Sequence, residues 1–193
     1  MNSRTNVNVS IDMDFVFGAS ESKYDLVYNP DDYSTNGLYK VLSVTLENET
    51  ETKKIAMIGD YLSSNEKCIV QEEDRLILLQ NDVLNVIDLQ TGALKEHIIL
   101  DNMGCNFEIY AVKDGYVIYG EEEISMLDRQ FRKKWGFCGR DIFISISGRT
   151  PFELRKRKIK LSDFHDNYYE IDYNGNVLVE RERERRSFSW CYS

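Results

Sequence analysis

A group of titratable side chains that could bind a metal ion or transfer a proton lies in the last quarter of the sequence. The group consists of Asp163, His165, Asp166 and Glu170. A carboxylate can orient an imidazole ring, and together they can bind a divalent cation or act in acid–base catalysis. The spacing matches no calcium loop or zinc motif, and Asp166-Asn167 is typical of a turn. We expect a plain hairpin turn here, with a metal site on Asp163, His165 and Asp166 as the alternative.

Other patterns of catalytic or cofactor-binding residues are missing from the sequence. The second histidine, His97, lies in an alternating strand-like segment. No Gly-x-Ser-x-Gly elbow, phosphate-binding loop or Cys-x-x-Cys pair occurs. We therefore expect no catalytic residue, no cofactor and four reduced thiols, namely Cys68, Cys105, Cys138 and Cys191.

Three segments could serve a protein partner. Two of them carry aromatic or arginine anchors of the kind favoured in interfaces, and their candidate residues are Trp135, Phe137, Arg140, Phe188, Trp190 and Tyr192. In the alternative for residues 135–140, the rings fill a core and the arginine pairs with a carboxylate. The third segment, the basic run at residues 155–160, could bind an acidic surface or lie as a solvated edge strand.

The C-terminal aromatic residues recur at every second position, as they would on one apolar face of a strand. We expect residues 187–192 to pack against the rest of the protein, with residues 7–13 as their strand neighbour. Deletion of residues 187–193 should then lower the stability.

Short strand-like segments make up most of the chain. They are rich in Val, Ile, Leu, Tyr and Phe, are separated by Gly, Asn or Asp, and include residues 7–13, 67–71, 75–79, 84–89, 107–112, 116–119, 124–127, 142–146 and 168–173. Asn174-Gly175 predicts a tight type I′ hairpin turn. Residues 152–161 fit either a helix or an edge strand. These patterns predict an all-β protein.

An aspartate recurs along the chain with a nearly constant spacing. Asp88, Asp128 and Asp172 are 40 and 44 residues apart, and each precedes a polar turn and a charged strand. Thr45 takes the same place in a fourth, less similar segment. An aspartate at the end of a strand accepts backbone N–H groups of the turn. We therefore predict that the three aspartates occupy equivalent structural turns in successive repeats.

A repeat of about forty residues with about four short strands is typical of propeller blades. The segment DRLILLQNDVLNVIDLQTGALKE resembles the repeat of quinoprotein-like and Trp-Asp-type β-propellers, and the resemblance covers roughly residues 67–182. It implies a propeller-like array of about four small antiparallel four-stranded blades in one domain, residues 1–193. A β-sandwich or an open β-meander is the alternative. Because the chain lacks Trp-Asp pairs and tryptophan-rich blades, no quinone cofactor is expected.

The composition and the net charge limit which functions and which classes of partner are expected. Of the 193 residues, 42% are hydrophobic, which suffices for a core, and the net charge is −9. Negative charge repels phosphate backbones, so no nucleic-acid partner is expected, while a basic protein would be attracted. No signal peptide or membrane-spanning run is visible, which favours the cytoplasm and no membrane partner.

Taken together, the residues favour a non-enzymatic protein-binding module, in its narrowest form a bacterial immunity-type or regulatory protein that neutralises a basic partner. The competing hypothesis is a hydrolase or lyase with its site at residues 163–170.

Overall fold

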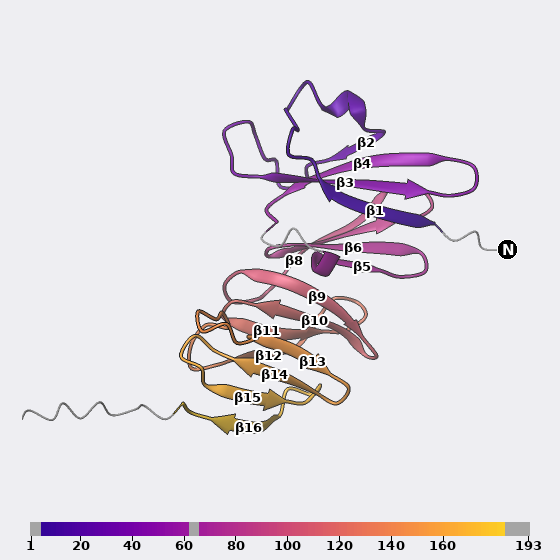
Figure 1. Cartoon of the computed structure of the whole chain (residues 1–193). Coiled ribbons are helices and arrows are strands. Elements are labelled where there is room, and N and C mark those ends of the chain that lie inside the picture. The colour runs from indigo at the N-terminus through magenta and orange to yellow at the C-terminus, as the bar shows by residue number, and fades with distance from the viewer. Residues whose placement is uncertain (1–4, 62–65, 184–193) are drawn as a thin grey trace, which may run out of the picture.

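The computed structural model describes residues 5–61 and 66–183. Figure 1 shows four sheets stacked in chain order. The first sheet contains β1 (Asn6–Ile11), β2 (Leu26–Tyr28), β3 (Lys40–Glu47) and β4 (Thr52–Gly59). The second contains β5 (Ile69–Gln71), β6 (Arg75–Gln80), β7 (Val83–Asp88) and β8 (Leu94–Ile99). The third contains β9 (Asn106–Val112), β10 (Gly115–Gly120), β11 (Glu123–Leu127) and β12 (Lys133–Cys138). The fourth contains β13 (Phe152–Arg155), β14 (Lys158–Ser162), β15 (Tyr168–Ile171) and β16 (Val177–Arg181).

Helical structure in these ranges is limited to two 3-10 turns, η1 (Glu21–Lys23) and η2 (Glu66–Cys68). Neither turn, at three residues each, approaches the length of a membrane-spanning helix, so the described residues contain no such helix.

Strand pairing follows the order of the chain in three of the four sheets. The second, third and fourth sheets are antiparallel meanders, each built from four consecutive strands. In the first sheet the order is β1-β3-β4-β2, and the short β2 runs parallel to β4. Repeated small four-stranded sheets are the units of propeller architectures. The expected all-β, propeller-like array of four blades is therefore confirmed, with β2 as the one parallel exception.

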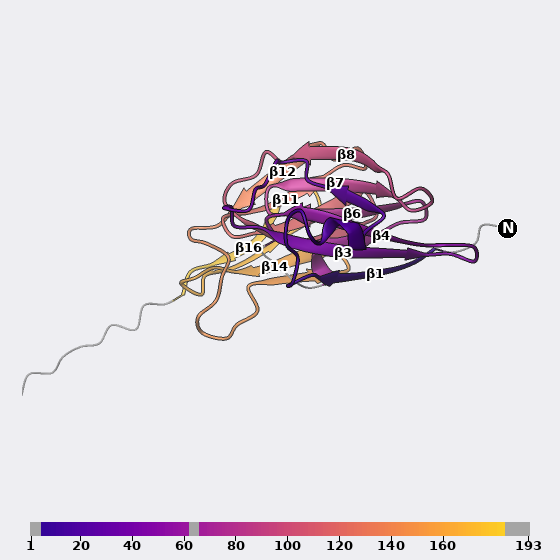
Figure 2. The same ribbon diagram turned by 90° about the horizontal axis from the view of Figure 1, so that it is seen from above.

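The middle strands of the inner sheets are buried on both faces. β7, β10 and β11 consist almost entirely of buried residues, which matches their nearly continuous apolar sequences. The fourth strands, β12 and β16, are mostly exposed. Viewed down the stack, the sheets overlie one another (Figure 2), so each inner sheet is covered by its two neighbours.

Apolar clusters hold successive sheets together. Leu42 and Ile55 of the first sheet share one cluster with Leu76 and Ile87 of the second. That cluster continues into the third sheet at Tyr116. A second cluster joins the third sheet to the fourth through Ile124, Met126, Phe152, Ile159 and Tyr169. The first three sheets therefore share one core, and the third and fourth sheets share another.

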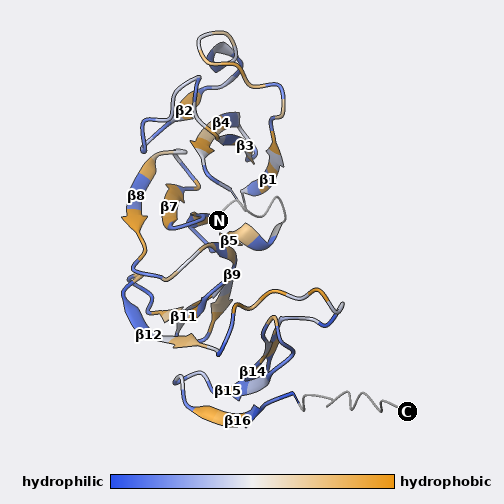
Figure 3. Cartoon of the chain, turned by 90° about the vertical axis from the view of Figure 1, so that its left-hand side faces the viewer, coloured by the Kyte–Doolittle hydropathy of each residue, from blue (hydrophilic) through white to orange (hydrophobic). Residues whose placement is uncertain are grey.

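The two ends of the stack are covered in different ways. The outer face of the first sheet, at Val41, Ala56 and Ile58, lies under the loops between β1 and β3. These loops contribute the aromatic rings of Phe15, Phe17, Tyr24, Tyr33 and Tyr39. The outer face of the fourth sheet carries charged side chains instead. β1 and β16 lie at opposite ends of the stack (Figures 1 and 3), so residues 5–61 and 66–183 form an open arc.

Two local expectations from the sequence were wrong, and for a third segment the structure decides between two alternatives. Residues 142–146 form no strand, because Phe143 leaves the sheet and fills the core between the third and fourth sheets. Residues 152–161 were expected to form either a helix or an edge strand, and they form the β13–β14 hairpin with β13 at the edge of the fourth sheet. The turn at Asn174-Gly175 is not type I′, because only Gly175 has a positive φ, of 84°, and Asp172 N–H bonds to the Asn176 carbonyl.

Candidate functional site

The histidine–carboxylate group predicted at residues 163–170 forms a structural turn. Asp163, which is fully buried, accepts backbone N–H groups from His165 and Asn167 on Oδ1, at 3.0 and 2.9 Å. Its Oδ2 accepts the Tyr169 hydroxyl and the Asn167 side-chain amide, both at 2.9 Å. The carboxylate of Asp163 is therefore occupied by the turn between β14 and β15.

The other members of the group point to separate partners. His165 Nδ1 lies 2.5 Å from Asp141 Oδ2. Asp166 accepts the Ser147 hydroxyl and pairs with Arg183 at 2.6 Å, and these contacts lower its pKa. Glu170 pairs with Lys158 on the outer face of the fourth sheet, and this hydrogen bond lowers its pKa. The described residues hold no group of three or more His, Cys, Asp or Glu side chains arranged to bind a metal ion.

The repeated aspartates lie in the turns between the third and fourth strands of the second, third and fourth sheets. The Oδ1 atom of Asp88 accepts the N–H groups of Gln90 and Thr91. Asp128 accepts those of Gln130 and Arg132, and Asp172 those of Asn174 and Asn176, with N···O distances of 2.8 to 2.9 Å. The carboxylates therefore stabilise turns, and they are spread along the array.

Sequence reasoning missed the corresponding residue of the first sheet. Thr45 lies within β3, opposite Lys54, and is not part of a turn. The turn between β3 and β4 is closed by Asn48, whose Oδ1 accepts the N–H groups of Thr50 and Glu51 at 2.9 Å. An amide oxygen accepts these bonds as a carboxylate does, so a search for Asp or Asn would have found it.

The predicted interface residues of the third sheet contact the fourth sheet. Trp135 donates its indole N–H to the Tyr173 carbonyl at 3.1 Å. Phe137 packs edge to face on Tyr169, with ring centroids 5.5 Å apart. Arg140 pairs with Glu180 at 2.9 Å. The other three candidates, Phe188, Trp190 and Tyr192, lie outside the described residues.

Exposed and half-buried carboxylates lie instead on the loops at one end of the strands. We call this surface the acidic loop face, and it consists of Asp31, Asp60, Asp82, Asp101, Glu121 and Glu122. Asp31, Asp60 and Asp82 surround Tyr33, where burial and then these negative charges raise the pKa of the phenol. Burial and then Glu121 and Asp60 likewise raise the pKa of the Cys105 thiol. The Asp82 carbonyl accepts the Leu100 N–H, which places Asp101 beside it. These contacts place the six carboxylates on neighbouring loops.

A chain of buried and half-buried polar side chains supports the acidic loop face. His97 Nε2 lies 3.1 Å from Asp31 Oδ1, and its Nδ1 lies 2.8 Å from Asn85 Oδ1. Asn85 donates to Gln80, which donates in turn to the Ile58 carbonyl at 3.0 Å. This chain fixes the loop that carries Asp31 to the second sheet.

Comparison with known proteins finds partial similarity to solved structures only. No family model and no curated protein matches the chain. BamB from Moraxella catarrhalis is 15% identical, over 65% of this chain and 43% of that chain, with a TM-score of 0.44. Hsv2p from Kluyveromyces lactis is 10% identical, over 72% and 46%, with a TM-score of 0.43. The dihydro-heme d1 dehydrogenase NirN is 14% identical, over 77% and 36%, with a TM-score of 0.48. The chain spans less than half the length of each of these structures.

Proposed function

We propose that this chain is a non-enzymatic protein-binding module that recognises a basic protein through the acidic loop face. The observation that carries the proposal is the placement of six carboxylates on neighbouring loops of three successive sheets. Clustered charge of one sign steers an oppositely charged partner and raises its association rate by about 10 to 1,000 fold. A basic protein is therefore the partner class that this surface fits best.

The loops of this face are held by the fold, which favours recognition of a preformed surface. The hydrogen bonds through His97 and Asn85 fix the Asp31 loop, and Asn81 donates to Asp60 at 3.3 Å. A surface that is ordered before binding loses little conformational entropy when the partner docks. Less of the free energy gained from the contacts with the partner is then offset by the ordering of these loops.

In its narrower form, the proposal is that the partner is a basic toxin or another basic protein under regulation. The chain is then an immunity-type or regulatory protein of the cytoplasm. The net charge of −9 supports a basic partner, and the free thiols of Cys105 and Cys138 support a reducing compartment. The competing hydrolase or lyase has less support, because Asp163, His165 and Glu170 each contact a different set of residues.

Affinity capture with charge-reversed variants tests the proposal. The face variant carries Asp82→Lys, Asp101→Lys and Glu122→Lys, three exposed positions that form no ion pair with any other described residue. The control variant carries Glu49→Lys, Glu96→Lys and Asp114→Lys, which are exposed away from this face and change the net charge equally.

Wild type and the control variant should capture the same basic protein from the native cell, and the face variant should lose it. Capture of that protein by the face variant at the wild-type level would contradict the proposal. So would a captured partner that is acidic.

A further inference from the structure

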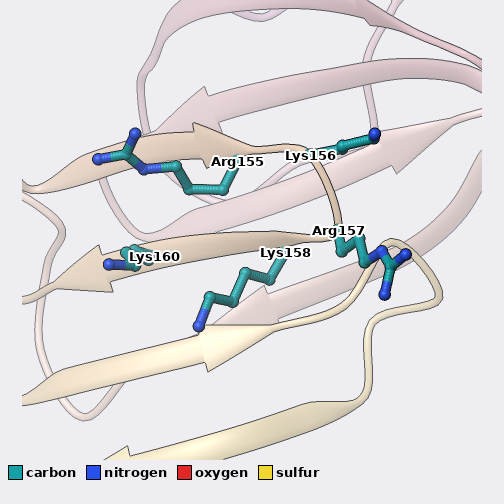
Figure 4. A pocket seen from close by; sticks show the side chains of 5 residues that line it. All are labelled: Arg155, Lys156, Arg157, Lys158 and Lys160. Atoms are coloured by element: carbon teal, nitrogen blue, oxygen red, sulfur yellow. The ribbon is translucent and has the colours of Figure 1, made fainter.

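The outer face of the last sheet carries a dense cluster of cations in an otherwise acidic protein. We call it the basic end face, and it consists of Arg155, Lys156, Arg157, Lys158 and Lys160. These residues line an open hollow of about 580 Å³ at the β13–β14 hairpin (Figure 4). In Figure 4 the side chains of Arg155, Lys158 and Lys160 lie side by side over the two strands, and Lys156 and Arg157 lie at the turn.

Strand alternation places these cations on the outside of the stack. Ile159 and Leu161 of β14 are at most 1% exposed and belong to the core shared with the third sheet. Successive side chains of a strand point to opposite faces, so Lys158 and Lys160 point away from that core. Arg155 pairs in register with Lys158 and shares this outer face.

Charge on the basic end face is only partly balanced by neighbouring carboxylates. Arg155 pairs with Glu153, and Lys158 pairs with Glu170 at 2.7 Å. Among the described residues, no ion pair is made by Lys156, Arg157 or Lys160. The five cations and the two carboxylates Glu153 and Glu170 leave a net charge of +3 on this face, although the whole chain carries −9.

The chemistry of this face excludes another apolar sheet as its occupant. A further blade would bury Lys160 between Glu153 and Glu170 under apolar side chains, and burial of such charges is costly. The interleaved carboxylates also disfavour a regular phosphate backbone, which would approach Glu153 and Glu170 as well as the lysines. A protein segment with spaced carboxylates can meet the cations and avoid both glutamates.

We propose that the basic end face binds an acidic protein segment in an extended conformation. Charge complementarity supplies the attraction, and the open hollow beside the hairpin gives the segment room. This surface lies on the outside of the fourth sheet and shares no residue with the acidic loop face, so the inference is independent of the proposed function.

The test measures binding of a fluorescein-labelled twelve-residue peptide of alternating Glu and Ser by fluorescence anisotropy in low salt. The face variant carries Lys156→Glu, Arg157→Glu and Lys160→Glu. The control variant carries Lys23→Glu, Lys113→Glu and Lys134→Glu, which are exposed elsewhere and change the net charge equally. A labelled single-stranded oligonucleotide and anionic lipid vesicles serve as competing probes.

We expect the wild type to bind the peptide, the face variant to lose at least about tenfold in affinity, and the control variant to stay within about threefold. Absence of peptide binding to the wild type would overturn the inference. An equal loss in both variants would overturn it too, since the effect would then follow net charge alone. Tighter binding of the oligonucleotide or the vesicles, lost in the face variant, would replace the acidic segment with a phosphate-bearing ligand.

Discussion

The indole N–H of Trp135 bonds to the backbone carbonyl of Tyr173 at 3.1 Å, and the same ring lies against Gly175. A Cβ atom placed on Gly175 would lie 2.9 Å from the indole Cγ, which is closer than side chains tolerate. Gly175 also has a φ of 84°, in the left-handed region that favours glycine. The last turn of the array and the fourth strand of the third sheet therefore depend on each other.

Replacement of Gly175 should destabilise the protein for two reasons at once. Gly175→Ala adds left-handed strain and overlap with Trp135, and we expect a loss of about 2 to 4 kcal/mol in the free energy of unfolding. Gly18→Ala is the control, because Gly18 has a φ of 78° but nothing within 4 Å of its Cβ position. Its loss should be about 1 kcal/mol. Urea unfolding measures both, and equal losses would show that the Trp135 contact does not constrain the turn.

The repeated turn aspartates should tolerate asparagine but not alanine. Asp172→Ala removes the acceptor for the N–H groups of Asn174 and Asn176, whereas Asp172→Asn keeps an oxygen there, as Asn48 does naturally. We expect thermal melting to place Asp172→Asn slightly below the wild type, because an amide oxygen is a weaker acceptor than a carboxylate, and Asp172→Ala clearly below both. A similar loss in both variants would mean that the charge, and not the acceptor oxygen, stabilises the turn.

Acid should weaken the same turns. Hydrogen bonds to the carboxylates, from the Thr91 N–H for Asp88, from the Arg132 N–H for Asp128 and from the Asn176 side chain for Asp172, lower all three pKa values below 3.8. When the folded-state pKa is lowered, the stabilisation is complete above the unfolded value and is lost as the pH falls through the folded value. Below about pH 4, the wild type should therefore lose stability more steeply than a triple variant with Asn at these positions. Parallel melting curves against pH would contradict this.

A charged hydrogen-bond network between the second and third sheets should contribute more to the free energy of unfolding than a neutral hydrogen bond does. The Tyr116 hydroxyl donates to Glu72 at 2.8 Å and accepts from Arg75 at 2.8 Å. Tyr116→Phe keeps the ring on Phe131 and should cost about 1.5 to 3 kcal/mol. Tyr28→Phe, which removes a hydroxyl bonded to the Gly92 carbonyl, should cost about 1 kcal/mol or less. Chemical denaturation of both variants compares them, and a smaller loss for Tyr116→Phe would contradict the network.

The turn between β14 and β15 should depend on Asp163 much more than on His165. Asp163 is fully buried with four hydrogen bonds, so Asp163→Ala should cost about 2 to 4 kcal/mol in unfolding free energy. The His165 side chain is 70% exposed, so His165→Ala should change stability by about 0.5 kcal/mol or less. If His165→Ala instead abolished a hydrolase or lyase activity of the wild type, the enzyme hypothesis would replace the binding module.

The sequence predicts the sheets well because burial between sheets makes the inner strands continuously apolar. Residues 75–79, 84–88 and 116–119 all fall within strands of the structure, and only Leu89 of the predicted segment 84–89 lies outside. Residues 142–146 are just as apolar, yet only Phe143 is fully buried, as a loop side chain in the core. Apolar composition therefore marks burial, and it does not distinguish a strand from a loop that fills a core.

The binding surfaces could be predicted only in part. Composition gives the net charge but not its location, so the acidic loop face emerges only when the loops of Asp60, Asp82 and Glu121 are placed at one end of the strands. Similarly, Asn85 lies within an apolar strand, and nothing along the chain links it to His97. Side chains that are far apart in the sequence and come into contact only in the folded protein leave no local sequence pattern.

Association kinetics of the captured basic partner test the role of the acidic loop face most directly. The association rate constant is measured in low salt for the wild type, for the variant Asp82→Lys, Asp101→Lys and Glu122→Lys, and for the control Glu49→Lys, Glu96→Lys and Asp114→Lys. We expect the association rate constant of the variant Asp82→Lys, Asp101→Lys and Glu122→Lys to be at least about tenfold below that of the wild type. The association rate constant of the control should stay within about threefold of the wild-type value. Equal rate constants for the two variants would contradict recognition through the acidic loop face.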